Sequence, residues 1–389
     1  MNRNVTLLSF SMALGMSSAP VIVLLGGILG VSLAPSPSLS TLPVAMMVVG
    51  VAIFTVPAAL IMRRTGRRPG FMGASVMATL ACVLGVYAIH IKGFALLCTV
   101  AFLIGGNMAF VQQYRFAAAE SVEAARVGKA VSLVLLGGIA AAFLGPELAK
   151  HARALLPFGL YSGSFGALAL LNLLNVALLS FLKEPGAAEN VITVRERPLA
   201  TVLRQPIYMT AVMAALVAYG VMSFIMTATP VSMHVMDAFS IEATAWVIQS
   251  HVMAMFIPSL FTGFLISRYG LAEVMLSGAA LMGVCVALSL ADRHFIHYWL
   301  GLVLLGVGWN FLFIGATTLL TGCYNPAERF KAQAINDFTV FGFQALASLS
   351  AGTVIFLAGW EMVNGLSLVP LLIVFRIIWR QRSSISLKG

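Results

Sequence analysis

The chain has 389 residues, of which 60% are hydrophobic and 9% are charged, and its net charge is +10. Soluble globular domains carry about 25% charged residues, so this composition excludes a water-covered domain and predicts a protein surrounded by lipid. The 4 cysteines show no spacing typical of a metal site or a disulfide framework. Because the sequence also lacks a phosphate-binding glycine loop and a nucleophile–base pair, we expect no enzyme activity, no metal and no cofactor.

A membrane-spanning helix needs about 20 mostly apolar residues, and the chain offers twelve such stretches. The first stays apolar from Val5 to Val31, which is longer than the roughly 7–15 apolar residues of a cleaved signal peptide. We therefore interpret it as a span. The twelve expected spans are 5–31, 41–62, 70–90, 94–118, 128–149, 157–182, 207–233, 241–267, 271–291, 296–321, 331–358 and 361–380.

Basic residues are distributed unequally between the two ends of these spans. Of the 23 basic residues, 19 fall on the side of the termini, and the other 4 are Lys92, Lys150, Arg153 and Arg293. Since basic loops stay in the cytoplasm, both termini are predicted to be cytoplasmic, in a bacterial cytoplasmic (inner) membrane. The net charge is then an orientation signal and does not indicate binding of nucleic acid.

Landmark residues recur at a nearly constant offset. Arg64 and Gly66 match Arg268 and Gly270 at an offset of 204 residues. Other pairs are Gly106 with Gly308 and Arg126 with Arg329, at offsets of 202 and 203. The longest polar stretch, residues 183–205, follows the sixth span. This pattern predicts two six-helix halves, 1–183 and 206–389, joined by a cytoplasmic linker at 184–205.

The loop after the second span resembles the signature G-x-L-x-D-R-x-G-R-R of the major facilitator superfamily of secondary transporters. Residues 59–68 read Ala-Leu-Ile-Met-Arg-Arg-Thr-Gly-Arg-Arg, and they match the signature at Arg64, Gly66, Arg67 and Arg68. They depart from it at Ala59, where a glycine is expected, and at Arg63, where an acidic residue is expected.

Two further stretches strengthen the resemblance. Residues 120–131, which include Arg126, resemble the family's loop between helices 4 and 5. Gly145-Pro146 resembles the Gly-Pro pair of the antiporter branch, with Ala141 where a flanking glycine is expected. The resemblance implies an all-α integral membrane protein with two six-helix bundles related by a pseudo-two-fold axis. It also implies a permease that works by alternating access, with a site near the midplane.

Polar residues inside spans are costly, so each is a candidate for binding substrate or protons. His251 lies about 4–5 Å from the expected midplane at 1.5 Å per residue, and imidazole titrates near physiological pH. A functional proton site and a structural histidine were equally favoured by these observations. The other candidates are Gln249, Asn107, Gln112, Asn310, Thr227 and Thr229, the last two before Pro230, which could equally mark a gating kink.

Charged residues near the cytoplasmic ends suggest a gate. Arg115 and Asp337 lie about 9–12 Å below the expected midplane, where pairing would lower the cost of burying either charge. Because Arg63 replaces the family's acidic residue, the charges look exchanged between the loop and the eleventh expected span, 331–358, which contains Asp337. An alternative is that Arg115 reaches the lipid headgroups. The predicted gating network comprises Arg63, Arg64, Arg115, Asn336, Asp337 and Arg126.

These observations predict a monomeric secondary transporter that moves a small organic solute, coupled to protons. Few fixed charges lie within the spans, so we expect a neutral, amphipathic or singly charged solute. The sequence leaves open uptake and efflux. It also leaves open a membrane sensor or assembly partner that has the same fold but does not transport.

Overall fold

The computed structural model describes residues 2–122, 127–184, 197–325 and 328–386. Within these ranges the chain is helical and forms no strand. The first half contains α1 (Arg3–Met16), α2 (Ser18–Leu33), η1 (Pro37–Leu39), α3 (Leu42–Thr65), α4 (Arg67–His90), α5 (Phe94–Val111), α6 (Tyr114–Glu120), α7 (Val127–His151) and α8 (Ser162–Leu179). The linker contains α9 (Leu199–Leu203), and the second half contains α10 (Pro206–Pro230), η3 (Val231–Met236), α11 (Ile241–Phe256), α12 (Ser259–Tyr269), α13 (Leu271–Ala291), α14 (Phe295–Thr321) and α15 (Arg329–Ser386).

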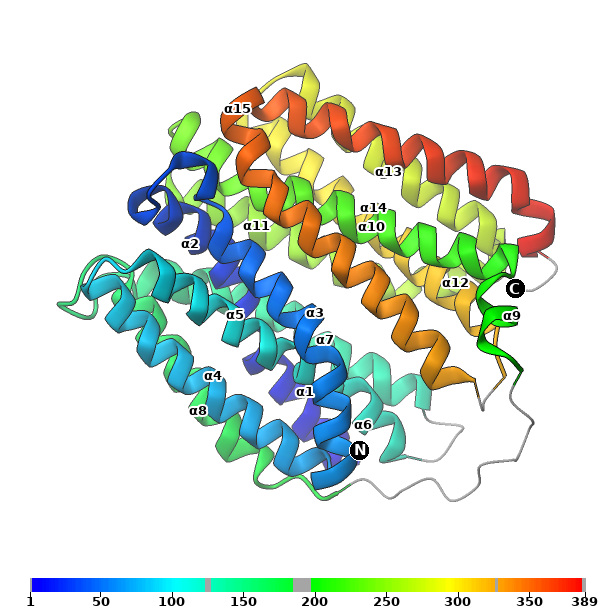
Figure 1. Ribbon diagram of the computed structural model, residues 1–389, viewed down its shortest axis with the longest axis horizontal. Helices are drawn as coiled ribbons and strands as arrows, with labels where there is room; N and C mark the ends of the chain where they lie inside the picture. The colour runs from blue at the N-terminus through cyan, green and yellow to red at the C-terminus, as the bar shows by residue number, and fades with distance from the viewer. Residues whose placement is uncertain (1, 123–126, 185–196, 326–327, 387–389) are drawn as a thin grey trace.

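The helices correspond to the twelve expected spans. By length and composition, 9 helical segments in the described ranges could cross a membrane, and the bent pair α11–α12 makes a tenth. Helix α15 covers two spans, because Gly359 breaks its helical backbone with φ 79° and ψ 178° and the chain turns back on itself (Figure 1). Helix α7, with 25 residues, completes the set.

Several spans are bent, and proline explains two of the bends. Helices α11 and α12 meet at 46°, with Pro258 between them. Helix α10 ends at Pro230 and continues as the π-helical turn η3. Proline lacks an N–H and clashes with the preceding turn, so it interrupts the regular helical hydrogen bonds at both places. Both breaks lie in helices that face the centre of the molecule.

The helices form two groups that divide the chain near its middle (Figure 1). In the first group α1 packs against α7, α3 against α5, and α4 against α8. In the second, α10 packs against α15, α13 against α14, and α11 against α14. The groups meet where α3 contacts α15, where α7 contacts α11 and where α2 contacts α10. The inner faces of these six helices therefore surround the central space.

The sequence repeat is visible in the backbone. Gly66 separates α3 from α4 with φ 93° and ψ 165°, and Gly270 separates α12 from α13 with φ 96° and ψ 153°. Residues with a side chain rarely adopt this positive φ, so glycine is required at both turns. The two halves thus make the same tight connection at equivalent positions.

Contacts between the two groups are concentrated at the end away from the termini. There Gly352 of α15 lies against Thr41 and Ser38, so that a side chain at this glycine would collide with them. Two polar contacts also cross between the groups: Gln249 donates to Glu147 at 2.9 Å, and Arg153 pairs with Glu242 at 3.3 Å. Toward the end that carries both termini the groups diverge (Figure 1). We call the closed end the outer seam.

Candidate functional site

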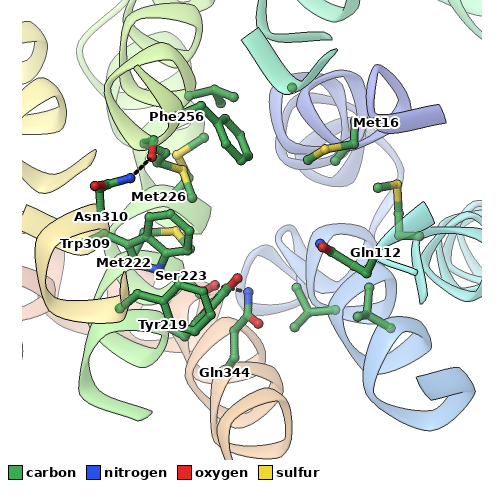
Figure 2. Close-up of a pocket in the computed structure, with 18 of the residues that line it drawn as sticks. Met16, Gln112, Tyr219, Met222, Ser223, Met226, Phe256, Trp309, Asn310 and Gln344 are labelled. Carbon is green, nitrogen blue, oxygen red and sulfur yellow. Dashed lines mark hydrogen bonds between the residues drawn. The ribbon is translucent and has the colours of Figure 1, made fainter. Parts of the chain in front are cut away.

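A cavity of about 330 Å³ lies between the two groups of helices (Figure 2). Its lining includes residues from α1, α2, α3, α5 and α7 on one side and from α10, α11, α14 and α15 on the other. Pockets for small molecules occupy roughly 300–1,000 Å³, so the volume suits a compact organic ligand. We call the two sides the N-wall and the C-wall.

The C-wall contains a cluster of four aromatic rings. Trp309 and Phe313, one turn apart on α14, stack with centroids 5.1 Å apart and planes at 18°. The Tyr219 ring of α10 meets both of them edge-on, at 5.1 Å and 4.9 Å, and meets Phe341 of α15 at 5.4 Å. Such edge-to-face contacts fix the rings in place. The wall therefore presents a rigid aromatic surface built from three helices.

Polar side chains lie beside this aromatic cluster. The Gln344 amide donates to the Ser223 hydroxyl at 2.7 Å (Figure 2). The Asn310 amide donates to the Ser259 hydroxyl at 2.6 Å and to the Met255 carbonyl at 2.7 Å. Each of these bonds connects two helices and orients an amide at the edge of the cavity.

The N-wall is largely aliphatic. Its residues include Met12, Met16, Val44, Met47, Val48, Val51 and Met108. Thioether side chains are flexible and polarizable, so they adapt to the shape of a ligand. The polar residues of this wall are Gln112, which points into the cavity (Figure 2), and Arg115. Arg115 is the one charged side chain among the described residues that line the cavity.

Arg115 and Asp337 belong to different halves but lie within electrostatic range of each other. Both also lie within electrostatic range of the Tyr219 phenol. The Asp337 carboxylate accepts a hydrogen bond of 3.0 Å from Asn336, which is itself buried. An acidic and a basic group thus lie near the cavity at the end that carries the termini.

Four of the polar residues selected from the sequence line the cavity: Gln112, Arg115, Asn310 and Thr227. Thr227 also bonds to Ser348 across α10 and α15 at 2.9 Å. Thr229 does not line the cavity; it is fully buried, and its hydroxyl donates to the Ile225 carbonyl of its own helix at 2.8 Å. The depth of these five residues in the membrane was predictable from the sequence. The direction in which each side chain points depends on how the helices pack.

The remaining binding candidates lie behind the walls. His251 is fully buried, and its Nδ1 lies 2.7 Å from the Leu302 carbonyl of α14, while its Nε2 has no hydrogen-bond partner among the described residues. Asn107 is also fully buried, and neither atom of its amide has a partner there. Gln249 belongs to the outer seam through Glu147.

The loop between α3 and α4 has an acidic partner that the sequence interpretation missed. Glu184, which follows α8, accepts backbone N–H bonds from Arg67 at 3.1 Å and from Arg68 at 2.9 Å. A carboxylate is favourable at the N-terminus of α4, where N–H groups are free. Arg64 is exposed beside this loop. The Arg63 side chain and all of Arg126 lie outside the described part of the structure.

The sequence interpretation also missed the residues that form most of the cavity surface. Tyr219, Trp309, Phe313 and Phe341 were not among the candidates selected from the sequence, and neither were the methionines of the N-wall. In a chain that is 60% hydrophobic, an aromatic residue gives no signal of facing a cavity. Among the described residues no cluster of three or more His, Cys, Asp or Glu side chains could hold a metal ion. The aromatic, thioether and amide side chains that line the cavity are suited to binding an organic molecule.

Two solved structures share this arrangement of helices. The chain superposes on a bacterial homologue of the human lysosomal transporter Spinster, in an inward-facing and occupied conformation, with a TM-score of 0.75 and 12% identity over 99% of this chain and 97% of the other. It superposes on the human organic anion transporter MFSD10 with a TM-score of 0.70 and 15% identity, over 97% and 99%. At these identities the likeness establishes the fold alone.

Sequence relatives are more informative. The riboflavin transporter RfnT of Brucella anthropi is 39% identical over 380 residues, which are 95% of each chain. The uncharacterized MFS-type transporter YddS of Bacillus subtilis is 26% identical over 97% of this chain and 90% of its own length. The family model of the major facilitator superfamily matches residues 5–240. This chain is therefore a multi-pass membrane transporter, not an enzyme, and it belongs to the major facilitator superfamily.

Proposed function

We propose that this protein transports riboflavin, or a closely related flavin, across the cytoplasmic membrane. The main support is the chemistry of the cavity, which combines a rigid aromatic surface with oriented amides and a single lining charge among the described residues. Riboflavin joins a flat, uncharged aromatic ring system to a polyol chain. A ligand of this kind suits stacking on aromatic rings and hydrogen bonding to amides. The 39% identity to a riboflavin transporter supports the same substrate.

We further propose that the halves 1–183 and 206–389 move against each other, connected by the linker 184–205. The closed outer seam and the diverging ends near the termini correspond to one state of alternating access. The asymmetry of 19 to 4 basic residues supports a cytoplasmic location for those ends. In the opposite state the seam would open and the helix ends near the termini would approach one another. The residues that line the cavity all come from one chain, so the working unit in this proposal is a monomer.

Proton coupling is the remaining part of the proposal. His251 is one candidate, because its unpartnered Nε2 has capacity for a proton or a water molecule. Asp337 is the other, because protonation would remove its interaction with Arg115. The two differ in position: His251 lies inside the second half, and Asp337 lies near the junction with the first. Loss of pH dependence in His251→Ala or in Asp337→Asn would identify the group.

Counterflow in proteoliposomes tests the transport proposal. Vesicles loaded with unlabelled riboflavin should accumulate labelled riboflavin, and a pH gradient imposed in each direction should change the rate and reveal the coupled direction. Protein-free vesicles give the background. Binding without counterflow would favour the sensor interpretation. Absence of both binding and counterflow would exclude a flavin as the substrate.

A further inference from the structure

Three polar side chains in the cavity have hydrogen-bonding capacity that the protein does not use. Among the described residues, no hydrogen bond is found for the Gln112 amide or the Tyr219 hydroxyl, and Gln344 uses one N–H of its amide, leaving its carbonyl and second N–H unpaired. Figure 2 shows Gln112 pointing into the cavity from the N-wall, opposite Tyr219 and Gln344. Unpaired polar groups that face a cavity are those that a ligand can use.

The Gln344 amide is held in a fixed orientation beside the aromatic cluster. Tyr219 and Ser223 are one turn apart on α10, and they face Phe341 and Gln344, which are one turn apart on α15. The Tyr219–Phe341 ring contact and the Ser223–Gln344 hydrogen bond join the two helices at consecutive turns. A flat ligand resting on the aromatic cluster would therefore present one edge to the Gln344 amide and the Tyr219 hydroxyl.

A carboxamide offers a donor and an acceptor side by side. Its complement is a ligand edge with a C=O next to an N–H, as in a lactam or an imide. The ring system of a flavin has such an imide edge on its pyrimidine ring, and the polyol chain leaves from the central ring. If the imide edge lies at Gln344, the polyol extends away from the C-wall, toward Gln112 on the N-wall.

We propose that Gln344 and Tyr219 recognise the imide edge of a flat heteroaromatic substrate, that Ser223 positions the Gln344 amide, and that Gln112 binds the polyol chain. This proposal rests on flavin transport as the proposed function and assigns its specificity to named groups. It predicts that the two glutamines have separate roles. Gln344 distinguishes ligands by their ring edge, whereas Gln112 distinguishes them by their side chain.

Binding to the purified, detergent-solubilised protein tests the assignment with three probes. Riboflavin carries both features, N3-methylriboflavin lacks the imide N–H, and lumiflavin lacks the polyol. Affinity is measured by quenching of flavin fluorescence. The wild-type protein should bind N3-methylriboflavin and lumiflavin each at least about tenfold more weakly than riboflavin, since a good hydrogen-bonded site rejects analogues that leave its groups unpaired.

The variants Gln344→Met and Gln112→Met remove one amide each and keep an unbranched side chain of similar size. Gln344→Met should bind riboflavin more weakly and should prefer it over N3-methylriboflavin by no more than the roughly threefold that Tyr219 supplies, while it still prefers riboflavin over lumiflavin. Gln112→Met should lose most of the preference for riboflavin over lumiflavin and should keep the preference for riboflavin over N3-methylriboflavin. Tyr219→Phe keeps the ring and should reduce the preference for the free imide about threefold or more. Ser223→Ala should reduce the same preference less than Gln344→Met. Thermal unfolding confirms that each variant is folded.

The outcomes separate this proposal from the function on which it rests. If the wild-type protein binds riboflavin and N3-methylriboflavin with equal affinity, recognition of the imide edge is overturned. The proposal of flavin transport is not affected by that result. Exchanged patterns in the two glutamine variants would show the opposite ligand orientation and overturn the assignment. Wild-type protein that binds none of the three probes would overturn both proposals.

Discussion

The two walls of the cavity are built by halves that repeat the same backbone plan but differ in chemistry. Gly66 and Gly270 adopt nearly the same dihedral angles at equivalent turns. Asn107 and Asn310, 203 residues apart, do not have equivalent roles. Asn310 lines the cavity and bonds to three partners, which are Thr262, Ser259 and the Met255 carbonyl. Asn107 is buried behind the N-wall, with no partner among the described residues.

This difference suggests that the two walls contribute differently to ligand binding. The C-wall fixes four aromatic rings and two amides by contacts between helices, so it is preorganised for one ligand shape. The N-wall offers flexible thioethers and aliphatic side chains, which contact a ligand without directing it. A substrate could stay bound to the C-wall while the N-wall moves relative to it, as alternating access between two halves requires.

The largest effect is expected at Asp337 and Arg115, which belong to different halves and lie within electrostatic range of each other. Removing one partner of a buried charge pair costs about 3–5 kcal/mol, because the other charge is left unpaired. Asp337→Asn should therefore shift the equilibrium between states and reduce riboflavin counterflow at least about tenfold. Riboflavin affinity should stay within about threefold, because Asp337 does not line the cavity. Counterflow and equilibrium binding, measured on the same preparation, separate the two effects.

Charge-exchanged double variants identify the partner of Asp337. Asp337→Arg with Arg115→Asp should recover part of the counterflow if Arg115 is the partner, and Asp337→Arg with Arg63→Asp tests the other arginine proposed from the sequence. Arg268→Ala, which removes an exposed charge elsewhere at the same end, is the matched control. No recovery in either exchange would contradict the gate and leave Asp337 as a proton or substrate site.

The next largest effect should distinguish the walls directly. Phe313→Leu removes a stacked ring from the C-wall, and aromatic pairs contribute about 0.5–1.5 kcal/mol beyond their buried area. Riboflavin affinity should fall about 2–10-fold. Met108→Leu on the N-wall conserves volume and should change affinity by less than about twofold. Equal losses in the two variants would contradict the assignment of recognition to the C-wall.

The sequence predicted the helices well because the membrane imposes their length and polarity. The expected span 271–291 has the same limits as α13, and the expected break between 358 and 361 contains Gly359. The repeat was visible as well, since Gly66 and Gly270 adopt a combination of positive φ and extended ψ that is open almost only to glycine. These features depend on local sequence and on the thickness of the bilayer, so one chain is sufficient to find them.

The site was only partly predictable. The sequence indicates how deep in the membrane a residue lies, but it does not indicate whether the side chain points toward the cavity. Gln112 and Arg115 stood out as polar residues in an apolar chain, and both line the cavity. His251 stood out for the same reason but faces α14. Trp309 and Phe341 gave no signal, because an aromatic residue can face lipid, core or cavity with the same local sequence. Assigning such residues requires the packing of all the helices.

A smaller effect is expected at the outer seam. The Gln249 side chain is 1% exposed and donates to Glu147 across the two halves, so Gln249→Leu should weaken the closed state. Hydrogen bonds to charged groups contribute about 1.5–3 kcal/mol to stability. The Glu147 side chain is 42% exposed, so water weakens this bond and its contribution to the closed state lies at the lower limit of that range or below it. The seam should therefore open about 2–5-fold more often.

Labelling of Thr41→Cys by a membrane-impermeant maleimide measures this opening, because Thr41 is buried against Gly352 at the seam. The four natural cysteines are buried and should give little background. His151→Ala, which removes a highly exposed contact of the same glutamate, is the matched control. An unchanged labelling rate in Gln249→Leu would indicate that other contacts hold the seam closed.

The smallest effect on transport is expected where the halves use the same chemistry. Glu184 accepts backbone N–H groups in the first half, and Glu328 accepts those of Arg197 at 2.8 Å and Asn325 at 2.9 Å in the second. The Arg197 guanidinium and these N–H groups lower the pKa of Glu328 from 4.5 to about 2. Glu328 therefore stabilises this contact fully above about pH 4.5 and loses the effect only as the pH falls toward 2.

Two results follow for the attachment of residues 197–205 to the second half. Amide exchange in this segment, corrected for its intrinsic pH dependence, should be the same at pH 7.5 and pH 5 in the wild-type protein, because Glu328 stays ionised at both values. Glu328→Gln should raise the exchange of the Arg197 amide at both values, while riboflavin counterflow changes by less than about twofold, because neither Glu328 nor Arg197 lines the cavity. Glu184→Gln should leave exchange in 197–205 unchanged, because that carboxylate bonds to α4. Exchange that rises in wild-type protein between pH 7.5 and pH 5 would mean that Glu328 takes up a proton in that range, and the linker rather than either wall would then respond to a proton gradient.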